Sequence, residues 1–286
     1  MLIEALQDAL LDSIKLFPFL YLVCLIMESI GHRAGKNHEE QIRQLNRYGP
    51  FFGGVLGVFP QCGFSSAASE LYARGIITMG TLLSVYLSTS DEMLTILIAR
   101  AVPPVRIIQI LLLKVFVGVL SGGLTDCLVR KKEPVQKELS LHSQAGCCQE
   151  KHGGIWRLAL RHSLSILLFI FVITGVLNSI IALCGENRLN GFWLNRPVVG
   201  EALAGLIGLI PNCAASVLLT ELYLEGGLSF SAMMSGLFVG SGVGILVLFR
   251  ENRGRWKENI RITLFLYGIG VAAGLGILFF QNIWGL

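Results

Sequence analysis

Residues 54–75 read GVLGVFPQCGFSSAASELYARG, and residues 205–226 read GLIGLIPNCAASVLLTELYLEG. The second stretch repeats the first 151 positions later, with the same spacing of Gly, Pro, Cys, Ser, Glu-Leu-Tyr and Gly. Both copies lie inside long apolar runs, and each is interrupted by a proline that polar residues follow. A repeat at a fixed spacing predicts two equivalent halves, and a proline inside a membrane-length apolar run predicts a broken helix.

The composition places both copies in a membrane. Hydrophobic residues make up 53% of the chain and charged residues 15%, whereas soluble domains carry about 25% charged residues. Runs long enough to span a bilayer cover 9–30, 49–72, 75–99, 103–128, 158–184, 197–224, 226–249 and 260–283. We therefore expect an all-α polytopic membrane protein, in which the net charge of +4 reflects basic loops and not nucleic-acid binding.

A polar stretch separates the two copies. This stretch, 129–154, predicts a linker between a first transmembrane repeat, 1–128, and a second, 155–286. Basic residues gather in 31–48, in the linker and in 249–261, which predicts that these are cytoplasmic loops of an inner or plasma membrane protein with both termini external. In each half, two apolar segments then lie between loops that are predicted on opposite sides of the membrane. Two plain helices would return the chain to the same side, so each half needs an odd number of crossings. We expect two inverted-topology repeats with broken or re-entrant helices and about ten transmembrane segments.

The polar residues after the two prolines are candidates for a substrate site. Backbone groups freed by a break at Pro60 or Pro211 must be satisfied by protein or by water in a cavity, so the breaks indicate a cavity. A helix that starts after each break would point its N–H groups into that cavity. The candidates for binding are Gln61, Cys62, Asn212, Cys213 and Ser216. A kink lined with small packing residues is the alternative interpretation.

The segment 75–99 carries adjacent carboxylates, Asp91 and Glu92, in its middle. Each costs about 2.5–3.5 kcal/mol inside a bilayer on insertion scales, which predicts that they face a pore or a cation. The stretch 239–244 of the second half has glycines instead, so we expect a site that is symmetric in backbone and asymmetric in charge. The neighbouring candidates are Ser88, Ser90 and Ser241, with breaks at Gly240 and Gly242. A hairpin tip that holds the acids in surface water is the alternative.

Other polar residues are candidates for coupling or for accessory metal binding. Glu70 and Glu221 recur before Leu-Tyr, where interfacial acids beside an aromatic belt are the alternative. Lys114 lies near the middle of 103–128 and either snorkels or pairs with an acid in one state of a transport cycle. A candidate accessory metal set in the linker matches no specific zinc spacing: His142, Cys147, Cys148 and His152. A disordered linker with incidental thiols is the favoured interpretation of these residues.

Four phrases, GVFPQCGFS, STSDE, IPNCAAS and GSGVG, resemble the manganese transporter family. That family is also described as ten-helix heavy-metal exporters and is distantly similar to arsenical permeases. The resemblance covers nearly the whole chain and implies a metal or metalloid exporter whose metal is cargo, with no cofactor. It places at the centre Gln61, Cys62, Ser90, Asp91, Glu92, Asn212, Cys213 and Ser241. Their oxygen ligands suit Mn²⁺, whereas two thiols favour Zn²⁺ or a trivalent arsenical.

We therefore expect a secondary transporter, not an enzyme, that moves a divalent metal ion, manganese first, out of the cytoplasm by alternating access. The expected partners are the bilayer, the metal ion, protons as coupling ion and a second copy in a homodimer. One alternative is a transporter of a sulfur-containing or other small anion, with Cys62, Cys213 and Lys114 in the site. The other is a membrane-embedded lipid-carrier phosphatase, which needs an Arg beside a nucleophilic Ser; neither break has one.

Overall fold

The computed structural model of the chain describes residues 39–58, 62–90, 93–130 and 197–284, and the single positions 21, 160, 164, 168 and 172. Every regular element in these ranges is helical, as the sequence predicts. The first half contains α2 (Glu39–Gly57), α3 (Cys62–Ala73), α4 (Met79–Ser88), α5 (Met93–Ala99) and α6 (Pro104–Arg130). The second contains α8 (Val199–Gly208), α9 (Cys213–Leu224), α10 (Phe230–Val239), α11 (Gly244–Glu251), the 3-10 turn η3 (Arg253–Arg255) and α12 (Trp256–Trp284).

Two predicted apolar segments in each half are divided between two helices. The segment 197–224 contains α8 and α9, and Pro211 lies between them. The segment 226–249 contains α10 and most of α11. The first half is divided in the same way, although Pro60 itself lies outside the described residues.

Two predicted loops are wrong in their bounds. α2 begins at Glu39, inside the predicted loop 31–48. α11 and α12 extend into the predicted loop 249–261 from both sides, so that only residues 252–255 lie between them. Charged residues can continue a helix beyond its apolar span because the backbone hydrogen bonds of a helix do not depend on hydropathy. The basic residues of 249–261 therefore lie largely on helices.

The helix boundaries repeat with the spacing of the sequence. α3, α4 and α5 begin 151 residues before their counterparts α9, α10 and α11, at Cys62, Met79, Met93, Cys213, Phe230 and Gly244. The ends of α3 and α9 also agree, because each is followed by a glycine with positive φ: +76° at Gly75 and +78° at Gly226. Such a glycine lets the following N–H group turn back to the last carbonyls, as the Ile76 N–H does to the Leu71 carbonyl at 2.9 Å.

One hydrogen bond repeats in space as well as in sequence. The Ser84 hydroxyl of α4 donates to the Pro50 carbonyl of α2 at 2.6 Å. At the corresponding positions of the second half, the Ser235 hydroxyl of α10 donates to the Glu201 carbonyl of α8 at 2.8 Å. All four positions are related by the same spacing, so the pairs α2–α4 and α8–α10 pack in the same register.

Four helical stretches of the described residues are long and apolar enough to cross a membrane: Met79–Ala99, Pro104–Leu128, Phe230–Glu251 and Arg253–Gln281. In the most apolar windows of the first and third, 69% and 83% of the residues are buried, against 28% and 22% in the second and fourth. α6 exposes a stripe of large apolar side chains spaced by four: Leu112, Phe116, Leu120, Leu124 and Leu128. The interrupted spans are therefore central, and α6 and α12 present apolar faces at the periphery.

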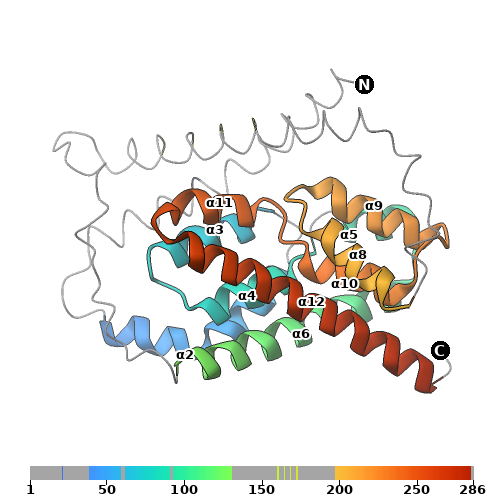
Figure 1. Cartoon of the computed structure of the whole chain (residues 1–286), viewed down its shortest axis with the longest axis horizontal. Helices are drawn as coiled ribbons and strands as arrows, with labels where there is room; N and C mark the ends of the chain where they lie inside the picture. Colours follow the sequence, from blue (N-terminus) through green and yellow to red (C-terminus); the bar gives the residue numbers. More distant parts are fainter. Residues whose placement is uncertain are drawn as a thin grey trace.

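Each half has a short helix that packs against the other half. α11 of the second half packs against α3 of the first, and α5 of the first half packs against the counterpart of α3, which is α9. Figure 1 shows α3 beside α11 towards one end of the molecule and α5 beside α9 towards the other. α12 runs between these two ends in front of α4. The short helices that flank the breaks thus form the contact between the halves.

Candidate functional site at the helix breaks

The break between α10 and α11 is formed by glycine backbone, as the sequence predicts. α10 ends at Val239, Gly240 is its C-terminal cap, and α11 begins at Gly244. Gly242 has a φ of +54°, which a residue with a side chain adopts at a cost. Ser241 is 1% exposed, and its hydroxyl has no hydrogen-bond partner among the described residues. A buried hydroxyl that makes no hydrogen bond is uncommon, and it marks this break as a place where a ligand would find a polar group.

Lys114 of α6 reaches this break from the first half. Its side chain is fully buried, and the ammonium donates a hydrogen bond to the Leu237 carbonyl at 2.8 Å. In an unbroken helix that carbonyl would accept from the Ser241 N–H, four residues on. The ammonium also lies 6.0 Å from the centre of the Phe238 ring. Lys114 therefore does not snorkel to the surface; it holds the end of α10, while its predicted acidic partners lie outside the described residues.

The break between α4 and α5 is lined by hydroxyl groups. The Ser90 hydroxyl donates to the Val58 carbonyl at 2.6 Å, which joins this break to the end of α2. The Ser88 hydroxyl donates within its own helix, to the Ser84 carbonyl at 2.8 Å and the Val85 carbonyl at 3.1 Å. These bonds fix the hydroxyl protons and leave oxygen lone pairs for other partners. Asp91 and Glu92 lie between the described residues Ser90 and Met93, so their predicted role is not tested by the structure.

New helices start after both proline positions. α9 begins at Cys213, and the side chain of Asn212 caps it by accepting from the Ala214 N–H at 3.4 Å. Cys213 is a partly exposed thiol that forms no disulfide, and the Ser216 hydroxyl donates to its carbonyl at 2.7 Å. α3 likewise begins at Cys62. The Cys62 side chain, Gln61 and the linker residues His142, Cys147, Cys148 and His152 lie outside the described residues.

A hydroxyl cluster that the sequence analysis does not predict joins the first half to the start of α11. The Ser69 oxygen lies 2.7 Å from the Tyr86 hydroxyl, 2.8 Å from the Gly244 carbonyl oxygen and 2.6 Å from the Ser65 carbonyl oxygen. Ser65, Ser69 and Tyr86 are fully buried. The signal in the sequence is the i, i+4 spacing of Ser65 and Ser69 on one face of α3. Their contact with Gly244, 175 positions after Ser69, follows only from the fold.

The two repeated glutamates lie in different surroundings. Glu70 is fully buried and forms an ion pair with Arg74 at 2.7 Å, one turn further along α3. Glu221 is 29% exposed and forms an ion pair at 2.6 Å with Arg100, just beyond the end of α5. Glu70 is thus enclosed by protein where α3 packs against α11, and the interfacial alternative stays a prediction for both glutamates. The Glu221 pair joins the two halves.

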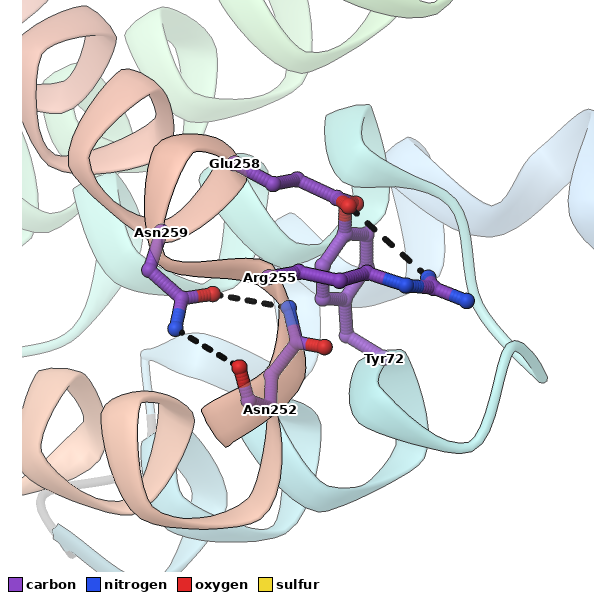
Figure 2. Close-up of polar contacts among 5 residues, drawn as sticks. All are labelled: Tyr72, Asn252, Arg255, Glu258 and Asn259. Carbon is purple, nitrogen blue, oxygen red and sulfur yellow. Dashed lines mark hydrogen bonds and ion pairs between the residues drawn. The ribbon is translucent and has the colours of Figure 1, made fainter. Parts of the chain in front are cut away.

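A polar network ties α3 to the turn between α11 and α12 (Figure 2). The Tyr72 hydroxyl donates to a Glu258 oxygen at 2.5 Å, and the Arg255 guanidinium lies 3.8 Å from the other Glu258 oxygen. Beside them the Asn252 side-chain amide donates to the Asn259 side-chain oxygen at 2.7 Å, and Asn259 donates back to the Asn252 carbonyl at 3.1 Å. Figure 2 shows all five side chains close to the turn that leads into α12. This network fixes the end of α3 against the second half.

Two further acids lie at the N-termini of the central helices α4 and α10. Asp126 of α6 accepts from the Thr78 hydroxyl at 2.6 Å and from the Gly80 N–H at 2.8 Å. Glu201 is 1% exposed and accepts from the Val198 N–H at 2.7 Å and the Ser231 hydroxyl at 2.8 Å. A carboxylate near a helix N-terminus is stabilised by the helix dipole and by free N–H groups. We assign both acids a structural role, which the sequence analysis does not predict.

Within the described ranges, the structure brings no three His, Cys, Asp or Glu side chains together in a way that could hold a metal ion. The described breaks offer oxygen groups instead: the Ser88 and Ser90 hydroxyls at one, the Ser241 hydroxyl at the other, and backbone carbonyls at both. Such a set can orient a cation or a polar cargo, and carboxylates would have to come from the acidic pair 91–92 between the described ranges. The predicted residues Ser88, Ser90, Asn212, Cys213, Ser216 and Ser241 all lie at the breaks or at the first turns beside them.

Comparison with protein families identifies the chain. Residues 1–195 match the family described as "Putative, 10TM heavy-metal exporter". The chain therefore belongs to this family of membrane exporters, which the sequence resemblance predicts. The match includes α2–α6 and ends before α8. A search of curated proteins and a search of solved structures each found no match. Family membership and the apolar spans together define a multi-pass membrane protein of a metal-transport class.

Proposed function

We propose that this chain exports a divalent metal ion, with manganese as the first candidate, from the cytoplasm by alternating access. The observation that carries the proposal is the pair of interrupted central spans, Met79–Ala99 and Phe230–Glu251, each broken where buried polar groups lie. Discontinuous helices at the contact between two repeats are the usual site of cargo binding in secondary transporters. The chain is on this view a transporter and not an enzyme.

The exchanged packing of the two halves supports an inverted repeat. α3 packs on α11, and the corresponding helices α9 and α5 pack on each other. A two-fold relation between the halves produces such reciprocal contacts, and an axis in the membrane plane would satisfy the odd number of crossings that the basic loops require. Rocking one half against the other would then expose the breaks first to one side and then to the other.

The proposed cargo ligands are the carboxylates of Asp91 and Glu92, supported by the hydroxyls of Ser88 and Ser90. Both hydroxyl protons are directed at backbone carbonyls, so the oxygens can present lone pairs to a cation. Mn²⁺ prefers carboxylate, carbonyl and water oxygens, which matches this set. Gln61 and Asn212 are proposed as amide ligands, and protons carried by Asp91 or Glu92 as the coupling ion.

The test measures metal content in cells that lack their own manganese exporter. We expect the native chain to lower cellular manganese and Asp91→Ala to abolish this effect. Mn, Fe, Zn, Co and As are quantified together by elemental analysis. The matched control is Glu225→Ala, which removes an exposed acid at the end of α9, away from the breaks, and should export like the native chain. No change in any element with the native chain would contradict metal export.

A second candidate cargo, a sulfur-containing or other small anion, is favoured by one observation. Cys213 is a partly exposed thiol at the first position of α9, where the helix dipole attracts negative charge. The variant Cys62→Ser/Cys213→Ser separates the candidates. An oxygen-ligated metal ion should still be exported, whereas a thiol-dependent cargo should not.

Orientation follows from the same proposal. The linker 129–154 would be cytoplasmic, with both termini external, in the inner or plasma membrane. Cys127 at the end of α6 is exposed, and Cys147 and Cys148 are natural labels in the linker. In intact cells a membrane-impermeant maleimide should leave all three unlabelled, and in inverted vesicles it should label them. Labelling in intact cells would reverse the proposed orientation.

A further inference from the structure

Carbonyl groups at the C-terminal ends of the two central helices, α4 and α10, accept hydrogen bonds from different donors. At the end of α4, the Val85 carbonyl accepts from the Thr89 hydroxyl at 2.7 Å and from the Ser88 hydroxyl at 3.1 Å. The corresponding residues at the end of α10 are Val239 and Gly240, which have no hydroxyl to offer. The Gly236 carbonyl, which corresponds to that of Val85, accepts only the Gly240 N–H among the described residues, at 2.9 Å, and the next carbonyl, that of Leu237, accepts from the Lys114 ammonium. One central helix is capped by its own side chains, and the other by a positive charge from a distant helix.

The C-terminal end of α10 has the properties of a cation site. A helix concentrates partial negative charge at its C-terminus, where the last carbonyls lack helical partners. Ser241 follows directly, with a buried hydroxyl that has no partner among the described residues and can turn its lone pairs towards a cation. Carbonyls at the ends of broken helices, together with hydroxyl oxygens, are ligands that secondary transporters use for Na⁺.

Lys114 brings a positive charge to this position. Its side chain is fully buried near the middle of α6, and taking an ammonium out of water costs several kcal/mol unless it is well paired. The repeat does not require a lysine here, because the corresponding residue of the second half is Phe265, which is 40% exposed. The charge is therefore specific to the first half, and it lies against the one central helix end that has no hydroxyl cap.

We propose that the Lys114 ammonium is a tethered cation that fills, at the C-terminal end of α10, a binding site for a monovalent alkali metal ion. The Leu237 carbonyl and the Ser241 hydroxyl are two of the ligands of that site. Because the lysine supplies the positive charge, the native chain needs neither Na⁺ nor K⁺ at this break. The inference goes beyond the proposed export of a divalent metal and does not depend on it.

Lys114→Met removes the charge and keeps the length and apolar stem of the side chain. Purified native and variant proteins are heated in detergent in NaCl, in KCl or in N-methyl-D-glucamine chloride of equal ionic strength, and the unfolding midpoint is recorded. We expect the native midpoint to be the same in all three salts. The variant should unfold earlier in the organic salt, and Na⁺ or K⁺ should raise its midpoint saturably, by about 5 °C when the site is filled.

Three further variants define the site. Lys114→Arg keeps the charge and should show no response to Na⁺ or K⁺. Adding Ser241→Ala to Lys114→Met should weaken the apparent affinity for the alkali ion at least tenfold. Adding Ser121→Ala instead should leave the affinity unchanged, because the Ser121 hydroxyl donates only to carbonyls of its own helix, those of Val117 and Gly118.

A folded Lys114→Met protein with the same midpoint in all three salts would overturn the proposal. If this variant does not accumulate, the same titration is made with Lys114→Gln, which retains a side-chain donor for the Leu237 carbonyl without the charge. Na⁺ or K⁺ must then raise the midpoint of Lys114→Gln and not that of the native chain. Neither result bears on metal content in cells, so failure here leaves the proposed export function standing.

Discussion

α3 and α9 have the same length, start with the same residue type and end in the same glycine turn, yet their side chains make different contacts. Tyr72 of α3 donates to Glu258, whereas Tyr223 of α9 has its ring 5.8 Å from that of Phe230 and no hydroxyl hydrogen bond among the described residues. Glu70 is buried with Arg74, and Glu221 is partly exposed with Arg100. The repeat has kept the positions of helix ends, while the polar groups on those helices have diverged.

This difference indicates where function can be asymmetric. Backbone-determined features recur in both halves: the breaks, the glycine turns and the serine bonds between neighbouring helices. Charge does not recur, since Lys114 corresponds to Phe265 and the acidic pair 91–92 corresponds to Gly242 and Val243. Two halves with the same backbone and different charges can bind a cation chiefly through one half, while the helices of both halves move during transport.

The largest effect is expected at the close helix contact beside each break. A Cβ added at Gly208 would lie 2.1 Å from the Gly236 carbonyl oxygen, so Gly208→Ala must separate α8 from α10. Overpacking of this kind costs about 3 kcal/mol, a large share of the stability of a typical domain. At Gly57 the nearest obstacles are the Ser88 hydroxyl at 2.1 Å, which can rotate away, and the Val85 carbonyl oxygen at 2.8 Å. Gly57→Ala should therefore lower the thermal midpoint in detergent less than Gly208→Ala.

The control for both is Gly268→Ala on α12, where no described atom lies within 4 Å of the added Cβ. We expect its thermal midpoint to be equal to or slightly above that of the native chain, because alanine is the better helix former. Equal losses for Gly57→Ala and Gly208→Ala would show that the two helix contacts are equally tight, and that the two halves do not differ at these glycines.

The second-largest difference is expected between the two repeated glutamates, in the free energy of unfolding that each substitution loses. Glu70→Gln removes the charge of a fully buried acid that pairs with Arg74, and the expected loss in free energy of unfolding is about 2 kcal/mol. Glu221→Gln breaks a pair whose partners are 29% and 55% exposed. Screening by solvent limits such a pair to less than about 1 kcal/mol. Denaturation of both purified variants at two salt concentrations measures the difference; a larger loss for Glu221→Gln would contradict it.

The smallest effect concerns the repeated tyrosines. Tyr72→Phe removes a hydrogen bond to the Glu258 carboxylate, at an expected cost of about 1.5 kcal/mol. Tyr223→Phe keeps the ring that packs on Phe230 and should be neutral. Differential scanning fluorimetry of the two variants side by side provides the measurement. A Tyr72→Phe protein as stable as the native chain would mean that the network of Figure 2 does not stabilise the end of α3.

The helix ends could be predicted from the sequence because the residues that end helices are chemically distinctive. Pro211, Asn212, Gly226, Gly240 and Gly242 each restrict or release the backbone locally, and the structure has a helix end or start at each of these places. The prediction of the breaks therefore needed no knowledge of the fold. The bounds of the loop 249–261 were harder, because charged residues on a helix and on a loop look alike in a hydropathy profile.

The partners of the polar groups could not be predicted in this way. Lys114 and Leu237 are 123 positions apart, and Ser69 and Gly244 are 175 positions apart. Their contacts depend on which helices pack together, and the repeat leaves that choice open. The burial of Glu70 has the same origin, because it depends on the packing of α3 within the fold. The candidate residues could be identified from local chemistry, whereas their hydrogen-bond partners depend on long-range packing.

The exchange of α11 onto α3 has a consequence for biosynthesis. α3 is complete long before α11 leaves the ribosome, and translation of the intervening chain takes on the order of ten seconds. During that time Ser65 and Ser69, which are fully buried in the finished protein, lack the covering helix that supplies the Gly244 carbonyl. The first half must wait in the membrane with hydroxyl groups uncovered. The packing around α3 is thus completed by a docking step that follows insertion of the first half and waits for the synthesis of α11.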